Sequence, residues 1–194
     1  MARVPEPSEE KKRLRREMIA RRDAMPAADR ERFAASIARH VAGLPQYRSA
    51  RTVLTTMSIG SEFSTQHFID RARADGKTIV LPRITAEKPK HLELHAVRDF
   101  VHDLVPGVWD IPEPDPARCP RVEITAVDFA LVPALALDRD KYRLGYGAGF
   151  FDGLLGSHKV RPYCVAALPG AFLVERLPHE AHDIPMDDVL GGEP

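Results

Sequence analysis

The sequence has little cysteine, and its few thiols form no motif. Two of its 194 residues are cysteines, Cys119 and Cys164, which lie far apart and form no Cys-x-x-Cys pair. This spacing argues against a zinc module or a dithiol redox motif and fits a reducing compartment. A chain of this length buries roughly 70% of its unfolded surface on folding, so stability requires neither disulfides nor a structural metal.

The sequence also lacks a net charge and a long apolar run. Its 28 Lys and Arg residues balance 28 Asp and Glu residues, so no overall field attracts a polyanion such as duplex DNA. Apolar stretches such as residues 134–137 are far shorter than the ~20 residues of a membrane helix, and the N-terminus has no signal-peptide core. We therefore expect a cytoplasmic protein with no nucleic-acid or membrane partner, in which any anion site is local.

The apolar pattern predicts helices that alternate with strands. Helices are expected at residues 11–22, 26–43, 64–75 and 150–155, and strands at residues 52–57, 77–81, 91–97, 128–137 and 163–168. Strands joined by helices of this length normally pair in parallel with a right-handed crossover. We therefore predict an α/β fold with a mostly parallel sheet.

Three strands carry more specific expectations. The strand at 77–81 is predicted to end before Pro82, because proline cannot donate a hydrogen bond to a sheet. Residues 91–97 alternate polar and apolar side chains, as in a strand with one solvated face at a sheet edge. Residues 128–137 predict a strand buried on both faces, with Pro133 making its far end irregular.

Glycines alternate in residues 143–152, RLGYGAGFFD, between the most buried strand and a short helix. Alternate glycines permit positive φ angles and can turn successive N–H groups toward one point, which suits a phosphate. The spacing matches neither the Walker A loop nor the GxGxxG fingerprint, and a tight turn without a ligand explains it equally well. Arg143 and Asp152 favour the functional interpretation, because arginine binds phosphate oxygens bidentately and a carboxylate can hold magnesium.

The segment ALVPALALD at 130–138, followed after a short gap by RLGYGAGFFD, resembles the signature of the 5-formyltetrahydrofolate cyclo-ligase family. Further blocks resemble that family in the same order: KKRLRREM at 11–18, residues 57–62, LPR at 81–83, PGVWDIPEP at 106–114 and LPHEAHDIPMDDV at 177–189. The resemblance implies one three-layer α/β domain over residues 1–194, Rossmann-like with helices on both faces, and any disorder is expected within residues 1–10. It also implies closure of 5-formyltetrahydrofolate to 5,10-methenyltetrahydrofolate with ATP and magnesium, releasing ADP and phosphate. We expect a monomer that acts on this small molecule.

The resemblance implies roles for individual residues. Those implied to bind ATP are Lys11, Arg15, Arg143, Leu144, Gly145, Tyr146, Gly147, Ala148, Gly149, Phe150 and Phe151. Those implied to bind the folate are Met57, Glu62, Tyr146 and Phe150, and the implied magnesium ligands are Asp152 and Asp183. The implied catalytic residues are Arg143, Tyr146 and Asp152.

These residue types suit the implied chemistry. A formamide oxygen is a poor leaving group, and phosphorylating it makes the formyl carbon electrophilic, so that N10 can attack and close the ring. Phosphoryl transfer needs positioning and charge neutralisation rather than a nucleophilic side chain. Tyr146, Phe150 and Phe151 could flank the pteridine, although both phenylalanines are explained equally well as core residues. Glu62 could accept hydrogen bonds from the N–H donors of the ring.

Some positions depart from the family pattern. Ala148 stands where many relatives carry glycine or a basic residue, and alanine tolerates this turn only with a negative φ. Phe150 and Phe151 stand where tyrosine is common, so a hydroxyl contact is missing there. Residues 189–192 lack the threonine often found after the C-terminal acidic block.

Other interpretations of the sequence stay open. His91, Glu93 and His95 would share one face of a strand and could bind a transition metal, but a solvated strand face explains the same alternation. The HEAH segment at 179–182 has the wrong spacing for the HExxH zinc motif. The chain could also be a folate- or nucleotide-binding relative without turnover, or an RNA-binding protein that uses the basic helix at 11–22.

Overall fold

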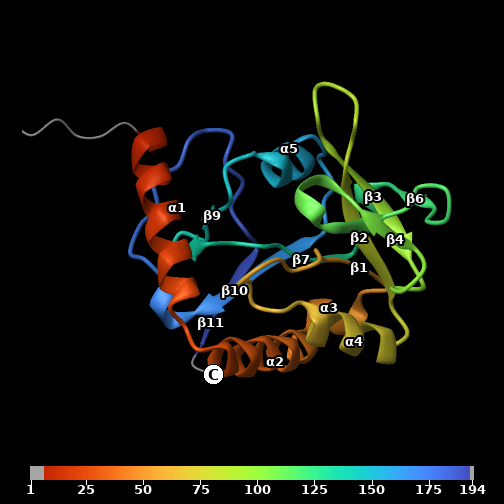
Figure 1. The fold of residues 1–194 in the computed structure, drawn as a ribbon, viewed down its shortest axis with the longest axis horizontal. Coiled ribbons are helices and arrows are strands. Elements are labelled where there is room, and N and C mark those ends of the chain that lie inside the picture. The colour runs from red at the N-terminus through yellow and green to blue at the C-terminus, as the bar shows by residue number, and fades with distance from the viewer. Residues whose placement is uncertain (1–6, 193–194) are drawn as a thin grey trace, which may run out of the picture.

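The computed structural model of this chain describes residues 7–192, and residues 1–6 and 193–194 lie outside the described part. At its centre is a seven-stranded sheet with the strand order β11-β10-β7-β1-β2-β3-β6 (Figure 1). The strands are β1 (Thr52–Leu54), β2 (Thr78–Ile84), β3 (Leu92–Val97), β6 (Arg121–Val122), β7 (Phe129–Leu131), β10 (Tyr163–Pro169) and β11 (Asp188–Gly192). Neighbours are parallel from β11 to β2, whereas β3 pairs antiparallel with both β2 and β6. The predicted α/β fold with a mostly parallel sheet is confirmed.

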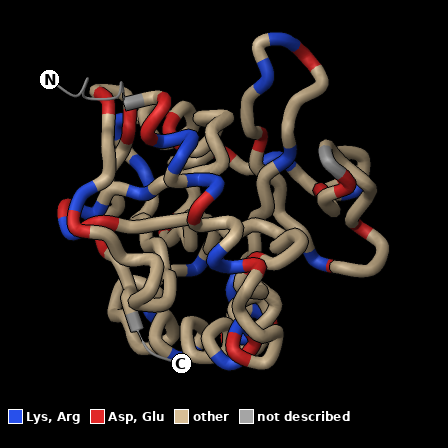
Figure 2. Tube along the Cα trace, turned by 60° about the vertical axis from the view of Figure 1, so that its left-hand side comes forward, with Lys and Arg blue, Asp and Glu red and all other residues tan. Residues whose placement is uncertain are grey.

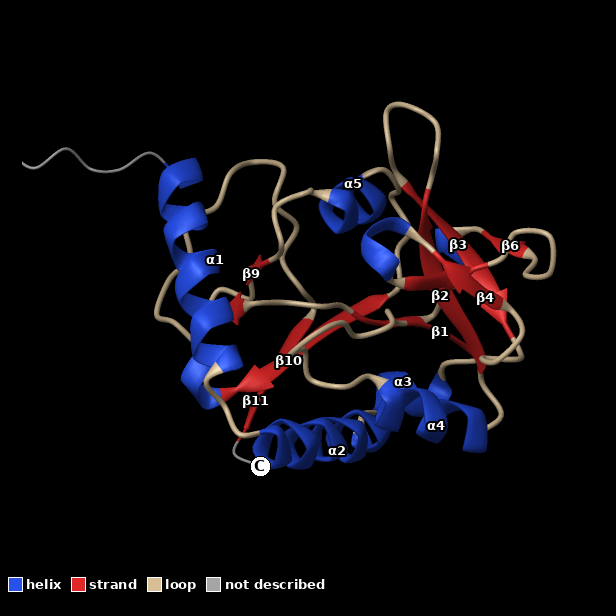
Figure 3. Cartoon of the chain, in the orientation of Figure 1, coloured by secondary structure: helices blue, strands red, loops and turns tan. Residues whose placement is uncertain are grey.

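Helices lie on both faces of the sheet (Figure 3). They are α1 (Pro7–Asp23), α2 (Ala27–Gly43), α3 (Pro45–Ser49), α4 (Gln66–Ala74) and α5 (Phe150–Gly156), with single 3-10 turns η1 (Val108–Asp110), η2 (Ile124–Ala126) and η3 (Gly170–Phe172). Residues 7–10 form the first turn of α1, and the rest of the segment expected to contain any disorder lies outside the described residues. No helix within residues 7–192 is both long and apolar enough to cross a membrane.

Successive residues of each central strand pack into two different apolar cores. Val53 and Phe129 belong to the core shared with α2, α3 and α4, whereas Leu54 and Ala130 belong to the core shared with α1 and α5. This alternation follows from the two-residue period of a strand. The predicted layers, with helices on both faces, are therefore confirmed.

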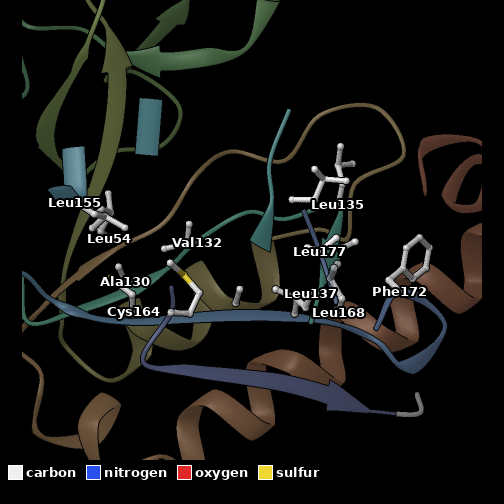
Figure 4. Packing of buried hydrophobic residues seen from close by; sticks show 14 of the residues in the cluster. Leu54, Ala130, Val132, Leu135, Leu137, Leu155, Cys164, Leu168, Phe172 and Leu177 are labelled. Atoms are coloured by element: carbon white, nitrogen blue, oxygen red, sulfur yellow. The ribbon is translucent and has the colours of Figure 1, made fainter. Parts of the chain in front are cut away.

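The core beneath α5 holds the ends of the central strands in place. Figure 4 shows Leu54 of β1, Ala130 of β7 and Cys164 of β10 packed near Val132 and Leu155. All of these side chains are buried. Burial raises the pKa of the Cys164 thiol to about 11, which leaves it protonated at neutral pH and chemically inert. This environment fits a cysteine that belongs to no sequence motif.

The strand predicted to end before Pro82 continues through it to Ile84. The cause lies in the neighbouring strand, because β1 pairs with β2 only over Thr78–Val80. At residue 82 the edge of β2 that faces β1 has no partner strand. The missing N–H of Pro82 therefore removes no hydrogen bond from the sheet.

The strand predicted over 128–137 is shorter than expected and ends at Leu131. Beyond Pro133 the chain forms β8 (Ala136–Leu137), which pairs antiparallel with β9 (Arg143–Leu144) in a separate two-stranded sheet. The irregularity expected at Pro133 therefore ends the strand altogether. The small sheet places Arg143 opposite Leu137 and so fixes the start of the glycine segment.

The predicted solvated face of residues 91–97 is wrong at its centre. His95 in β3 is 3% exposed, and its Nδ1 lies 2.9 Å from the carbonyl oxygen of Cys119. A second small sheet, formed by β4 (Leu104–Pro106) and β5 (Pro112–Pro114), also contacts this part of the main sheet. These covering segments come from elsewhere in the chain, so the alternation within β3 cannot reveal them.

Candidate functional site

A cavity of about 790 Å³ opens beyond the ends of the central strands. Thr56 and Met57, which follow β1, line it together with Pro133, which follows β7. Because β2 and β7 flank β1 on opposite sides, this is the point where the strand order reverses, and α/β folds bind ligands in the crevice there. The volume is in the range of small-molecule sites.

Every predicted site residue lines this cavity. The set comprises Lys11, Arg15, Met57, Glu62, Arg143, Leu144, Gly145, Tyr146, Gly147, Ala148, Gly149, Phe150, Phe151, Asp152 and Asp183. The fold thus brings the N-terminal helix, the segment after β1, the glycine segment and the C-terminal segment to one place. Phe151 also packs against the apolar core beneath α5. This residue therefore both lines the cavity and belongs to the edge of the core, the two roles that the sequence left open.

The glycine segment, residues 145–149, forms a tight loop between β9 and α5. Gly147 and Gly149 adopt φ angles of 106° and 70°, whereas Ala148 between them stays outside the left-handed region, as the sequence requires. A Cβ atom on Gly147 would lie 3.1 Å from Cζ of Arg15. The Arg15 Nε donates a hydrogen bond of 2.8 Å to the carbonyl oxygen of Gly145. The absence of a side chain at residue 147 therefore lets the arginine lie directly against the loop.

Lys11 reaches the cavity from α1 and is held by two carboxylates. Its ammonium lies 2.6 Å from Oδ2 of Asp183 and 3.1 Å from Oε2 of Glu180, and the residue is 8% exposed. Burial lowers the pKa of Lys11, but the two carboxylates raise it by more, so that it lies above its usual value. Burial likewise opposes ionisation of Asp183, yet hydrogen bonds from Lys11 and the Glu180 amide keep its pKa low. Both groups are therefore charged at neutral pH.

Arg143 and Asp152 form a buried ion pair at the cavity wall. The Arg143 Nη2 lies 3.0 Å from Oδ1 of Asp152, and its Nη1 donates to the carbonyl oxygen of Ile184 at 3.0 Å. The Ile184 N–H in turn donates to Oδ1 of Asp152 at 3.0 Å. The Arg143 side chain is only 4% exposed. The C-terminal segment thus orients both of these predicted catalytic residues.

The predicted magnesium ligands lie on the same cavity but in different groups. Asp183 clusters with Glu180 and His182, whose ligand atoms all lie within 4.8 Å of one another. Asp152 is not a member of this cluster. Glu180 and His182 were missed by the sequence reasoning, although both stand in the block at 177–189 that resembles the family.

Tyr146 connects the glycine loop to Glu62. Its hydroxyl donates a hydrogen bond to Oε1 of Glu62 and accepts one of 2.8 Å from Nη1 of Arg22. The second oxygen of Glu62 accepts from the Ile59 N–H at 2.9 Å. Burial and the neighbouring Glu62 carboxylate raise the pKa of Tyr146, so its hydroxyl stays protonated. Sequence reasoning placed Arg22 only on a basic helix and missed this contact.

The other end of the cavity is mostly apolar and holds one buried carboxylate. The apolar side chains are Leu81, Pro82, Ile84, Leu92, Ile111 and Pro112. Glu113 among them is 4% exposed, and its nearest cation is Arg83, with 3.7 Å between Oε2 and Nη1. Several of these residues lie in the blocks LPR and PGVWDIPEP. The resemblance to a family therefore pointed to this part of the cavity, whereas the chemistry of the individual residues did not.

The alternative metal site at residues 91–95 does not form within the described residues. His95 bonds to a backbone carbonyl, Glu93 pairs with Arg121 at 3.0 Å, and these residues are absent from the one metal-type cluster found there. His179 of the HEAH segment stacks on Tyr142 with ring centroids 4.0 Å apart. Glu180 and His182 of the same segment belong instead to the cluster with Asp183.

The charges of α1 are largely paired along the helix. Lys12 pairs with Glu9 at 2.7 Å, and Arg13 pairs with Glu10 and Glu17. Figure 2 shows basic and acidic residues interspersed along the chain. The outer side of this helix is a solvated face with several ion pairs. On its inner side, Lys11, Arg15 and Arg22 make contacts with the rest of the fold.

Comparison with known proteins adds to this geometry. A model of the 5-formyltetrahydrofolate cyclo-ligase family matches residues 7–192. The chain is similar to the 5-formyltetrahydrofolate cyclo-ligase of Mycolicibacterium smegmatis, with 33% identity over 93% of this chain and 92% of the relative. It is 26% identical to the mouse (Mus musculus) 5-formyltetrahydrofolate cyclo-ligase, over 93% and 92% of the two chains. The NMR structure of the Aquifex aeolicus 5,10-methenyltetrahydrofolate synthetase superposes with a TM-score of 0.79 at 28% identity, covering 93% of this chain and 89% of that one.

Proposed function

This chain belongs to the 5-formyltetrahydrofolate cyclo-ligase family and is an enzyme of that kind, and from this premise we propose that it uses ATP and magnesium to close 5-formyltetrahydrofolate. The products are 5,10-methenyltetrahydrofolate, ADP and phosphate. One observation carries the proposal: the cations of α1, the glycine loop and the residues implied to bind folate line a single cavity. A phosphoryl group bound at the loop and a folate bound beside it would therefore meet.

The cationic part of the cavity suits the triphosphate. Lys11 and Arg15 reach it from α1, and Arg143 reaches it from β9. The N–H groups of residues 145–149 add hydrogen-bond donors. Phosphoryl transfer needs this kind of charge neutralisation and positioning more than it needs a nucleophilic side chain.

The donor set suits magnesium. Asp152 and Asp183 offer carboxylate oxygens, the ligands that this ion prefers, and Glu180 lies beside Asp183. Bound there, magnesium would neutralise charge on the phosphate oxygens. We assign Asp152 and Asp183 as the residues that hold it.

The folate is proposed to lie against Met57, Glu62, Tyr146 and Phe150. The Glu62 carboxylate accepts hydrogen bonds from N–H donors of the pteridine, and the aromatic rings of Tyr146 and Phe150 flank it. Tyr146 belongs to both the nucleotide loop and the folate end, because its hydroxyl contacts Glu62.

We propose that the reaction has two steps. The formyl oxygen attacks the γ-phosphorus of ATP and ADP leaves, which turns the oxygen into part of a good leaving group. N10 then attacks the formyl carbon, phosphate departs and N10 loses its proton. Arg143 neutralises charge on the transferring phosphoryl group. The cavity walls hold N10 close to the formyl carbon, which lowers the entropic cost of ring closure.

The direct test mixes the full chain with ATP, magnesium and 5-formyltetrahydrofolate and follows the near-ultraviolet absorbance of the methenyl product. We expect the absorbance to rise, with one ADP formed for each product molecule. Omitting ATP provides the control. Binding of ATP and folate without product would favour the alternative of a non-catalytic relative. Binding of neither ligand would contradict the proposal altogether.

A further inference from the structure

Arg22 is a buried cation that the proposed reaction does not use. It lies in the last turn of α1 and is 6% exposed. Its Nε donates a hydrogen bond of 3.0 Å to Oγ of Ser61, and its Nη1 donates one of 2.8 Å to the hydroxyl of Tyr146. The guanidinium carbon lies 5.8 Å from the centre of the Tyr146 ring. One side chain therefore links α1, the segment that carries Glu62, and the glycine loop.

The charge of Arg22 has no direct counter-ion in the part of the chain that the structure describes. Both of its hydrogen-bond partners are neutral hydroxyl groups, and no carboxylate there forms an ion pair with it. A buried charge without a partner is costly, and an apolar side chain would fill the same space at a lower cost. Two carboxylates are each linked to Arg22 through one hydroxyl group: Glu62 through Tyr146, and Asp23 through Ser61.

The chemistry of the three groups fixes the direction of these hydrogen bonds. A guanidinium can only donate, so the Tyr146 oxygen must act as the acceptor toward Arg22. The hydroxyl hydrogen of Tyr146 is then free to point to the Glu62 carboxylate, which can only accept. Arg22 thus orients Tyr146 toward Glu62 and holds Ser61, the neighbour of Glu62, at the same time. A lysine has one nitrogen on a flexible stem and cannot reproduce the rigid fork that serves two segments.

From these contacts we propose that Arg22 is a positioning residue that couples nucleotide binding to folate binding. The inference rests on the proposed function, since it assigns ATP to the glycine loop and folate to Glu62. A nucleotide bound at the loop would fix Tyr146, and Arg22 together with Tyr146 would then hold Glu62 in the orientation that folate needs. Coupling of this kind is reciprocal, so each ligand tightens the binding of the other by the same factor.

The test measures the dissociation constant of 5-formyltetrahydrofolate with and without a non-hydrolysable ATP analogue and magnesium. In the wild type we expect the analogue to tighten folate binding roughly tenfold, within the usual range of such coupling. In Arg22→Met the factor should fall to about one, while the affinity for the analogue alone stays unchanged. Arg22→Lys should also lose most of the coupling. Arg21→Met is the matched control, because within residues 7–192 the Arg21 guanidinium donates hydrogen bonds to Glu17 and the Ala171 carbonyl and to no residue of the cavity, and it should keep the full factor.

A second measurement separates coupling from folding. Tyr146→Phe should remove the coupling in the wild-type background and remove nothing further in Arg22→Met, because both changes break the same link. Thermal unfolding of each variant shows whether it is folded at the temperature of the titration. Full coupling in folded Arg22→Met would overturn the inference, as would independent binding of the two ligands in the wild type. Failure of the wild type to bind either ligand would instead contradict the proposed function, and the inference would fail with it.

Discussion

The Lys11 ammonium lies 2.6 Å from the Asp183 carboxylate and joins the N-terminal helix to the C-terminal segment at the cavity wall. Both groups are mostly buried, so solvent and salt screen this pair less than a surface ion pair. The same residues are the proposed contacts for phosphate and magnesium. Ligand binding must therefore compete with a contact that also stabilises the fold.

Replacing Asp183 by asparagine is expected to lower the free energy of unfolding at neutral pH by about 1 kcal/mol, since Glu180 still contacts Lys11. Although burial opposes it, Lys11 and the Glu180 amide lower the pKa of Asp183 in the folded protein. The contribution is therefore fully present above the pKa of an unfolded aspartate and is lost as the pH falls through the folded pKa. Urea unfolding of both proteins should give a constant difference between about pH 5 and 7, which shrinks as the pH falls below the pKa of an unfolded aspartate. A difference that grew on acidification would contradict this account.

Asp152 is expected to be needed for turnover, and the choice of variant decides how clearly this can be measured. Asp152→Ala leaves the buried Arg143 without its carboxylate, which should cost roughly 1–3 kcal/mol of stability in addition to activity. Asp152→Asn keeps an oxygen that can accept the hydrogen bonds from Arg143 and Ile184. It should lose the magnesium-dependent rate with a much smaller shift in the unfolding temperature. Initial rates at saturating substrates test this, and a normal rate in the asparagine variant would remove Asp152 from the proposed metal site.

Local sequence pattern predicted the longer helices and the inner strands of the main sheet, because their apolar periods are set by neighbouring residues, but it did not predict α3 or the edge strands β6 and β11. It failed where a distant segment decides the outcome. Pro82 is tolerated in β2 because β1 is short, and His95 is buried because the chain around Cys119 covers it. Neither fact can be read from the residues of the strand itself.

The candidate site shows the same division. The glycine loop was predictable, since alternating glycines have a direct conformational meaning and Gly147 and Gly149 do adopt positive φ angles. The contacts of Arg22 and Glu180 were not, because they join residues far apart in sequence, and charged side chains on a helix or in a loop are usually solvated. Only the resemblance to a family brought Lys11, Glu62 and Asp183 into the predicted site.

Glu62→Gln is expected to weaken the binding of folate more than the binding of ATP. The change keeps the shape of the side chain but replaces one acceptor oxygen by a donor, which should cost a charge-assisted hydrogen bond and raise the dissociation constant of 5-formyltetrahydrofolate roughly tenfold. Separate titrations with folate and with an ATP analogue measure the two effects. Glu17→Gln on the outer side of α1 is the control and should change neither. Equal losses for both ligands in Glu62→Gln would exclude a direct folate contact.

Gly147→Ala tests the glycine loop itself. Alanine at a φ of 106° is strained, and its Cβ would lie 3.1 Å from Cζ of Arg15, so both the loop and this cation must shift. We expect a loss of stability of about 1–3 kcal/mol and an ATP affinity lower by about tenfold or more. Gly153→Ala is the matched control, because Gly153 lies within α5 and, apart from its chain neighbours and the backbone of its own helix, no atom of the described residues lies within 4 Å of an added Cβ. Alanine there should stabilise the helix by roughly 0.5–1 kcal/mol. If calorimetry showed that Gly147→Ala binds ATP as tightly as Gly153→Ala, the loop would be a tight turn that does not bind the phosphates.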